Sequence, residues 1–146
     1  MPDFELTIGN VTFKTLANGM RAVFIDAEDT TRDVVVMRTV AAGSRQEMPG
    51  CGGSAHFWEH GLFKGSVKYN GRNGIWHRLG SRGVEMNAET WEDGTRYYMQ
   101  GDAEFVYHLI DMEAARTEAP QITDMDVDME RKVVINEKEI GGNNPL

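Results

Sequence analysis

The sequence has few of the features that mark secreted, membrane or nucleic-acid-binding proteins. It contains a single cysteine, Cys51, so an internal disulfide is excluded. No apolar stretch is long enough to cross a membrane, and the first ten residues have neither the basic region nor the apolar core of a signal peptide. We therefore expect a cytoplasmic protein without a membrane partner.

Basic residues are also in the minority. The chain has 15 lysines and arginines against 23 acidic residues, which gives a net charge of −8. Phosphate contacts need clustered Lys and Arg, so this balance argues against a nucleic-acid partner. A hydrophobic fraction of 40% and a charged fraction of 26% are typical of a soluble globular protein, and 146 residues are the length of a single domain.

What the sequence does contain is a pentad of the form His-x-x-Glu-His, which begins at His56. Residues three and four apart share one face of an α-helix, so His56, Glu59 and His60 would project together. Two imidazoles are half of a zinc site, and a catalytic zinc needs a third protein ligand from elsewhere in the chain. Glu59 is better placed to take a proton from water than to bind the metal. The alternative is a helix on which these three residues fell together by chance, without a metal.

The rest of the sequence predicts alternating strands and helices of the α+β class. The Asn18-Gly19 dipeptide is a strong hairpin signal, and Asp102 and Thr123 are expected to cap two later helices. We expect strands at 5–13, 20–25, 34–41 and 84–90, a turn at 92–94 into one more strand, and helices at 53–64, at 74–79, after 102 and after 123. The apolar face of the helix after Asp102 is predicted to be core and consists of Phe105, Val106, Leu109, Ile110 and Met112.

Two glutamates of the last predicted helix are spaced to meet the pentad. Glu130 and Glu137 are seven residues apart, two turns along one face, with Val133 and Val134 between them packing toward the sheet. A metal-bound histidine usually donates its other ring N–H to an acceptor, so Glu130 is a candidate for the group that orients an imidazole. The alternative is that both are solvated glutamates of an amphipathic helix.

Four segments, in the same order, resemble the M16 metallopeptidases, the family that includes pitrilysin, insulin-degrading enzyme and the mitochondrial processing peptidase. Together they cover nearly the whole chain. The segment around the pentad is 53–66, GSAHFWEHGLFKGS, and the others are 15–21 (TLANGMR), 83–98 (GVEMNAETWEDGTRYY) and 130–140 (ERKVVINEKEI).

The resemblance implies a zinc-dependent peptidase and completes its metal site. Glu137 would be the third ligand beside His56 and His60, with one Zn²⁺ per chain, and Glu130 an accessory catalytic glutamate. Glu59 would be the general base that takes a proton from water and passes it to the leaving amine. The expected activity is endopeptidase cleavage of extended peptides or short unfolded polypeptides by an inverted zinc motif, as in the inverzincins.

The resemblance also implies where a substrate binds. In the family an extended peptide adds as a strand to a sheet edge, so Asn87 and Ala88 would bind the substrate backbone. Glu89 follows them at a position where the family carries a neutral residue. We expect Glu89 to favour basic side chains near the cleavage site.

Family members continue beyond the part that this chain resembles, with the rest of the domain and a second half that closes over the substrate. We interpret residues 1–146 as a single active-site domain, truncated relative to the family, with an antiparallel or mixed sheet and helices on one face. A fragment, a natural miniature and one subunit of an assembly are all consistent with this sequence. An uncovered sheet edge favours association, so we expect a homo-oligomer or a heteromeric partner that supplies the missing half. One alternative is a zinc-binding but inactive subunit that needs the partner chain or missing half-domain. Another is a metal-free interaction module.

Overall fold

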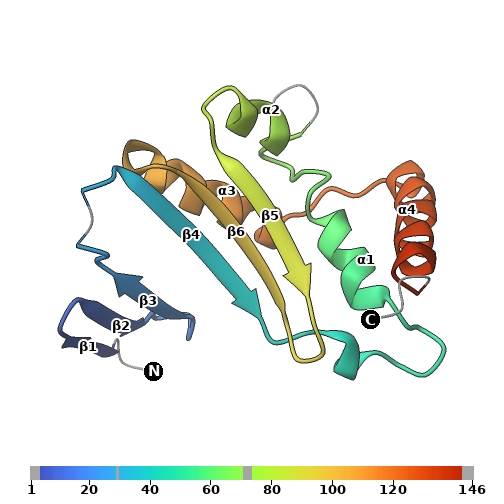
Figure 1. The fold of residues 1–146 in the computed structure, drawn as a ribbon, viewed down its shortest axis with the longest axis horizontal. Coiled ribbons are helices and arrows are strands. Elements are labelled where there is room, and N and C mark those ends of the chain that lie inside the picture. The colour runs from blue at the N-terminus through green and yellow to red at the C-terminus, as the bar shows by residue number, and fades with distance from the viewer. Residues whose placement is uncertain (1–3, 29, 71–73, 143–146) are drawn as a thin grey trace. The chain divides into compact units, whose positions relative to one another are not determined.

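The computed structural model describes residues 4–28, 30–70 and 74–142, and it shows an α+β protein (Figure 1). The chain forms two compact units whose boundary lies between Arg32 and Asp33. The first unit contains β1 (Phe4–Ile8), β2 (Val11–Thr15) and β3 (Arg21–Ile25). The second contains β4 (Asp33–Val40), α1 (Ser54–Gly61), α2 (Ile75–Gly80), β5 (Glu85–Thr90), β6 (Thr95–Asp102), α3 (Val106–Glu118) and α4 (Asp124–Gly142).

The first unit is an antiparallel meander in the order β1-β2-β3. The single strand predicted at 5–13 is wrong, because Gly9 takes a left-handed φ of 60° and starts a two-residue turn between Ile8 and Val11. The predicted hairpin at Asn18-Gly19 is confirmed, with φ of 84° at Gly19. Glycine suits both turns because it has no Cβ to clash in the left-handed region.

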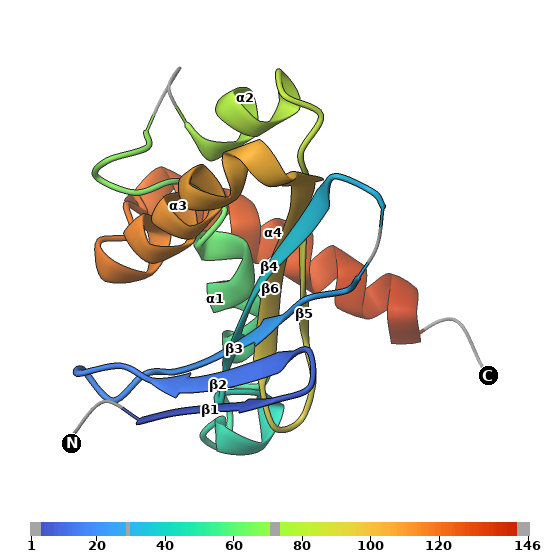
Figure 2. The same ribbon diagram turned by 90° about the vertical axis from the view of Figure 1, so that its left-hand side faces the viewer.

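The second unit contains the other antiparallel sheet, in the order β4-β6-β5. This order makes β6 the central strand and leaves β5 at an edge. Figure 2 shows the sheet nearly edge-on, with α1 and α3 on the same side. Helices on one face of an antiparallel sheet are the arrangement predicted from the sequence.

The core of the second unit lies between this sheet and the helices. On β6, Tyr97 and Met99 are almost completely buried, and the residues between them are less so, which is the period-two alternation of a half-buried strand. The main apolar cluster joins Met99 to α2 and α3 and consists of Tyr69, Ile75, Leu79, Val84, Met99, Leu109 and Met112.

The predicted apolar face of the helix after Asp102 is partly wrong. Asp102 does cap its start, accepting from the Glu104 amide at 2.9 Å, although the first turn is a 3-10 turn. Leu109 and Met112 are buried, but Ile110 is 47% exposed. The buried face continues instead through Glu113 and Arg116, because these residues follow Leu109 and Met112 at helical spacing.

The last helix, α4, packs against α1. Its start is a reciprocal cap, in which the Asp126 amide donates to Thr123 Oγ1 at 3.2 Å and the Thr123 amide donates to Asp126 Oδ2 at 2.9 Å. Val134 is buried as predicted, whereas Val133 is 40% exposed. No helix in the described part of the chain is both long and apolar enough to span a membrane.

Candidate metal centre

The pentad lies on α1, and the start of this helix is held by a residue outside it. Gly53, with φ of 97°, has no side chain to cap the helix. The carboxylate of Glu47 takes that role and accepts from the amides of Gly53 and Ala55, both at 2.8 Å. These hydrogen bonds, from Ala55 first and then Gly53, lower the pKa of Glu47. The helix is thereby tied to the loop that follows β4.

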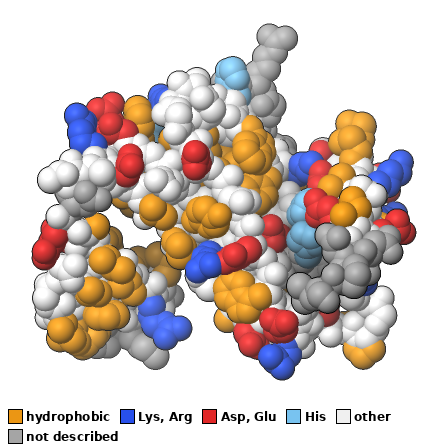
Figure 3. Space-filling view, viewed as in Figure 1, with side chains coloured by type: hydrophobic (Ala, Val, Ile, Leu, Met, Phe, Trp, Pro, Cys, Tyr) orange, Lys and Arg blue, Asp and Glu red, His pale blue; other side chains and the backbone are white. Residues whose placement is uncertain are grey.

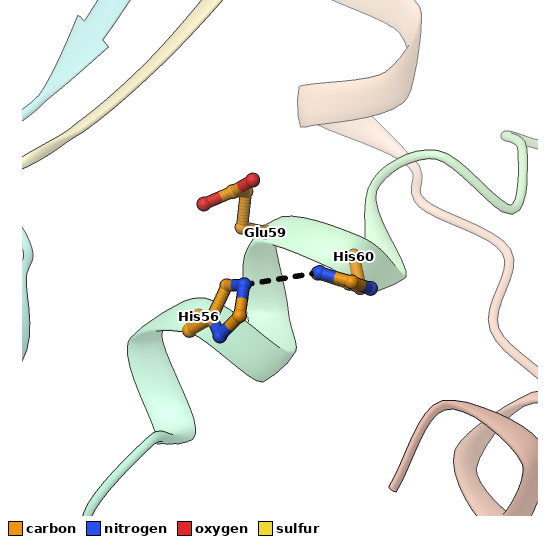
Figure 4. A group of neighbouring side chains, drawn as sticks. All are labelled: His56, Glu59 and His60. Atoms are coloured by element: carbon orange, nitrogen blue, oxygen red, sulfur yellow. Dashed lines mark hydrogen bonds between the residues drawn. The ribbon is translucent and has the colours of Figure 1, made fainter. Parts of the chain in front are cut away.

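Three side-chain atoms that could bind a metal converge at the exposed side of α1. The Nε2 atoms of His56 and His60 are 3.1 Å apart, and Glu137 Oε2 lies 3.4 Å from the first and 3.5 Å from the second. Tetrahedral zinc ligands at roughly 2.0–2.1 Å from the metal lie about 3.3–3.4 Å from one another. The triangle therefore has the dimensions of one face of a zinc tetrahedron. Figure 4 shows the two imidazole rings next to each other on α1, and their planes are nearly perpendicular, at 85°.

Glu130, the other predicted glutamate of α4, contacts the His60 imidazole at the nitrogen that faces away from the triangle. Glu130 Oε2 lies 2.9 Å from His60 Nδ1, and the Lys64 ammonium donates to the other carboxylate oxygen. Burial opposes the ionisation of Glu130, but the hydrogen bonds from Lys64 and His60 outweigh it and lower its pKa. Because an ionised carboxylate only accepts hydrogen bonds, the ring proton of His60 sits on Nδ1. The lone pair of Nε2 then faces the triangle, as metal binding requires.

Glu59 comes from the turn between the two histidines but does not join the triangle. Its side chain is buried, and Oε2 accepts a hydrogen bond from Thr90 Oγ1 at 2.5 Å. A carboxylate oxygen of Glu59 and a ring nitrogen of each histidine lie within 4.8 Å of one another. This distance places Glu59 beside the potential metal position, where a group can exchange a proton with a water molecule.

A cavity of about 470 Å³ lies over the site and includes one of the three predicted substrate residues. Asn87 contributes to its wall, while Glu89 is exposed and ion-paired with Arg96. Ala88 lies between them on the edge strand β5, and its amide donates to Asn87 Oδ1 at 2.9 Å. The cavity is lined by Glu59, His60, Phe63, Lys64, Trp76, Asn87 and Glu137.

The site is open to solvent on one side. The side chains of His56 and Glu137 are 38% and 46% exposed, whereas those of His60 and Glu130 are 20% and 11% exposed. Figure 3 shows histidine side chains at the surface beside acidic ones, in the region where Figure 1 places α1 and α4. The triangle is therefore accessible from the side of His56 and Glu137.

Sequence reasoning missed three residues that organise the site. Lys64 lies beyond the end of α1 at Gly61, where the predicted helix at 53–64 stops early, so helical spacing gave no signal for its contact with Glu130. Thr90 lies within the segment 83–98 that resembles the family, but the resemblance implies no role for it. Glu47 had no local signal, because its contact with the helix depends on how the intervening loop folds.

The fold and the site together define an α+β domain with a potential His–Glu–His metal site. Insulinase, peptidase family M16, is the family whose model matches residues 22–143. The chain belongs to this family.

Named relatives and a solved structure agree with this assignment. The chain is 31% identical to the mitochondrial-processing peptidase subunit beta of Caenorhabditis elegans, over 86% of this chain and 27% of that protein. It is 32% identical to a Streptomyces coelicolor protein named an uncharacterized zinc protease, over 91% of this chain and 28% of that protein. The crystal structure of a Helicobacter pylori protease has the same fold, with a TM-score of 0.76 and 24% identity over 93% of this chain and 30% of that one. The chain thus spans less than a third of the length of each.

Proposed function

We propose that this chain carries the catalytic site of a zinc-dependent endopeptidase that hydrolyses extended peptides or short unfolded polypeptides. The observation behind this proposal is the triangle of His56, His60 and Glu137, with Glu59 beside it. Two neutral imidazoles and one carboxylate are a frequent ligand set for catalytic zinc, and they leave the fourth position to a reactant. The family relationship to zinc proteases supports the same metal, at one ion per chain.

Each residue of the proposed site has a separate role in the reaction. Zn²⁺, when bound, supplies the Lewis acid that activates water and polarises the peptide carbonyl. Glu59 takes the proton from water and returns it to the leaving amine. Glu130 holds His60 in the tautomer that presents Nε2 to the metal, and Lys64 holds Glu130.

Substrate binding is proposed at the edge strand β5. An edge strand offers unpaired backbone groups to which an extended peptide can add. Asn87 lines the cavity, and its Oδ1 accepts a hydrogen bond from the Ala88 amide. A carbonyl group of an incoming peptide can replace Asn87 Oδ1 as the acceptor. The predicted preference of Glu89 for basic residues must compete with Arg96, which already neutralises its charge. Replacing Glu89 by Gln and comparing cleavage of a peptide library tests that preference.

The partner and the location of the protein are also proposals. The relative in C. elegans is by its name one subunit of a peptidase. We propose that a second copy or another chain supplies the surface that closes over a substrate. A cytoplasmic location stays a prediction, since this relative is by its name mitochondrial.

A second candidate function is a zinc-binding subunit without activity of its own. The exposed side of the triangle favours it, because nothing in the described part of the chain covers His56 and Glu137 there. Both functions need the metal, so zinc content alone does not separate them. Intact Glu59 favours the peptidase, because a purely structural site has no use for a base.

The test measures zinc by mass spectrometry and cleavage of a quenched, unstructured peptide on the same samples. We expect one zinc per chain in the wild type. Glu59→Gln should keep the zinc and lose roughly 10²–10⁴-fold in rate. Glu137→Gln should lose zinc and activity together, while Glu139→Gln, an exposed neighbour on α4, should lose neither.

Each outcome decides between the candidates. Zinc without cleavage in the wild type would favour the inactive subunit. A wild type that binds no zinc would overturn both. Equal zinc content in Glu137→Gln and the wild type would remove Glu137 from the ligand set.

A further inference from the structure

Two threonine hydroxyls connect Glu59 to the backbone at the end of the second sheet. Thr90 ends β5, Thr95 begins β6, and the two are direct partners across the hairpin. Thr90 Oγ1 lies 2.5 Å from Glu59 Oε2 and 3.2 Å from Thr95 Oγ1, and Thr95 Oγ1 donates to the Ala42 carbonyl at 2.8 Å. The contacts form a continuous path from a backbone carbonyl to the carboxylate.

The proton positions along this path follow from the chemistry of the groups. An ionised carboxylate only accepts, so Thr90 is the donor to Glu59. A hydroxyl carries one proton, and the Thr95 proton goes to the Ala42 carbonyl, so Thr95 has none to donate to Thr90. The Thr90 hydroxyl therefore donates its hydrogen bond to Glu59 Oε2. Thr95 and Glu59 are 4% and 6% exposed, so water competes little for these bonds.

We propose that Thr90 is a positioning residue that holds Glu59 by Oε2 and leaves Oε1 free to exchange a proton. This inference rests on the proposed function. The terminal torsion of a glutamate is broad, so an unheld carboxylate samples many orientations. With Oε2 held, the proton from water goes to Oε1 and leaves from Oε1 to the amine. Thr90 donates to Oε2 in the ionised and in the protonated state, so the hydrogen bond lasts through the reaction.

The sheet makes Thr90 rigid enough for this role. Its backbone is paired to β6, and a β-branched side chain has restricted χ1 freedom. Glu59 is a residue of α1, which packs on β5. The hydrogen bond therefore connects two elements of regular structure rather than two loops.

The first test uses substitutions that separate the hydroxyl from the shape of Thr90. Thr90→Val removes the hydroxyl and keeps the branching, and Thr90→Ser keeps the hydroxyl. We expect Thr90→Val to lower kcat by roughly 10- to 100-fold with KM and zinc content unchanged, and Thr90→Ser to restore most of the rate. The control is Thr39→Val, an exposed position of the same sheet, which should leave kcat unchanged.

A second readout does not depend on activity. In the metal-free protein, Thr90→Val should lower the Tm by a few degrees when Glu59 is present, and by clearly less in the Glu59→Ala background, where the acceptor is gone. Equal losses of Tm in both backgrounds would overturn the inference. So would a Thr90→Val variant with full kcat, or a Thr90→Ser variant as slow as Thr90→Val.

The two readouts also separate this inference from the proposed function. A wild type that binds zinc but cleaves nothing would contradict the proposed peptidase activity. The difference in Tm between the two backgrounds would still decide whether Thr90 holds Glu59.

Discussion

The two sheets of this protein are equal in strand number and both are antiparallel, yet they differ in burial. In β1 the apolar residues Phe4, Leu6 and Ile8 alternate along the strand and are 55%, 44% and 63% exposed. In β6 the alternate residues Tyr97 and Met99 are 1% and 0% exposed. A period-two apolar pattern therefore identifies a strand but does not tell whether its apolar side is covered.

The difference comes from the helices of the second unit. Helices α1 and α3 pack on the β4-β6-β5 sheet and remove its apolar side from water. The same packing brings Glu59 from α1 to Thr90 of the sheet. In the second unit, the same packing therefore buries the core and brings the site residues together.

Tryptophan fluorescence can follow this unit alone. All three tryptophans, Trp58, Trp76 and Trp91, come after the boundary at Asp33. Their emission during denaturation reports the unfolding of the second unit, and the following predictions use it.

The largest expected effect is at the buried ion cluster beneath the second sheet. Glu113 contacts Arg38 and Arg116, both at 2.5 Å, and the Arg116 side chain is 0% exposed. Glu113→Ala leaves two guanidiniums without this carboxylate, and we expect a loss of roughly 3–5 kcal/mol in the free energy of unfolding. Glu118→Ala, at the exposed end of α3, should change it by less than about 0.5 kcal/mol. A loss for Glu113→Ala as small as that for Glu118→Ala would show that the cluster contributes little.

The next effect is at the loop after β4. A Cβ on Gly43 would lie 2.1 Å from the Trp91 carbonyl oxygen, because the loop packs directly on the β5–β6 turn. Gly43→Ala should lower the free energy of unfolding by roughly 1–3 kcal/mol. Gly80→Ala is the matched control, since nothing lies within 4 Å of its Cβ position. A Gly43→Ala protein as stable as the control would mean that the loop moves away at no cost.

A smaller effect is expected at the cap of α1. Glu47→Gln weakens the two hydrogen bonds to the helix start and should cost roughly 0.5–2 kcal/mol near pH 7. The folded pKa of Glu47 is below its usual value, so this contribution is complete above the unfolded pKa of about 4.3 and disappears as the pH falls through the folded pKa. Denaturation of the wild type and of Glu47→Gln at several pH values should show that the difference in their free energies of unfolding becomes smaller below about pH 4. A difference that is constant with pH would exclude a role for the charge. Glu85→Gln on the exposed side of β5 should show no such difference.

The smallest effect is expected in the first unit. Ile8→Ala replaces a side chain that is 63% exposed and should change the free energy of unfolding by less than about 0.5 kcal/mol. Ile75→Ala replaces one that is 1% exposed and should cost roughly 2–5 kcal/mol. Circular dichroism is needed beside fluorescence, because the first unit has no tryptophan. A large loss for Ile8→Ala would show that the first sheet is covered in solution.

Much of the local structure could be predicted because its causes are local. The turns at Asn18-Gly19 and at 92–94, and the caps at Asp102 and Thr123, depend on residues that are neighbours in the chain. The single strand at 5–13 was wrong because the prediction passed over Gly9-Asn10, a dipeptide that also favours a two-residue hairpin turn. The burial of Glu113 and Arg116 could not be predicted, because charged residues are buried only where the fold supplies partners.

The sequence by itself determined the spacing of His56, Glu59 and His60, since one helical turn places them together without any other contact. It also pointed to a glutamate of the last helix. Only the tertiary structure decided that Glu137 lies at Nε2 and Glu130 at Nδ1 of the His60 ring, and that Thr90 contacts Glu59. The reason is the separation along the sequence, because helix periodicity relates residues only a few positions apart. These contacts join residues about thirty to eighty positions apart, and they depend on the packing of α4 on α1 and of α1 on the sheet.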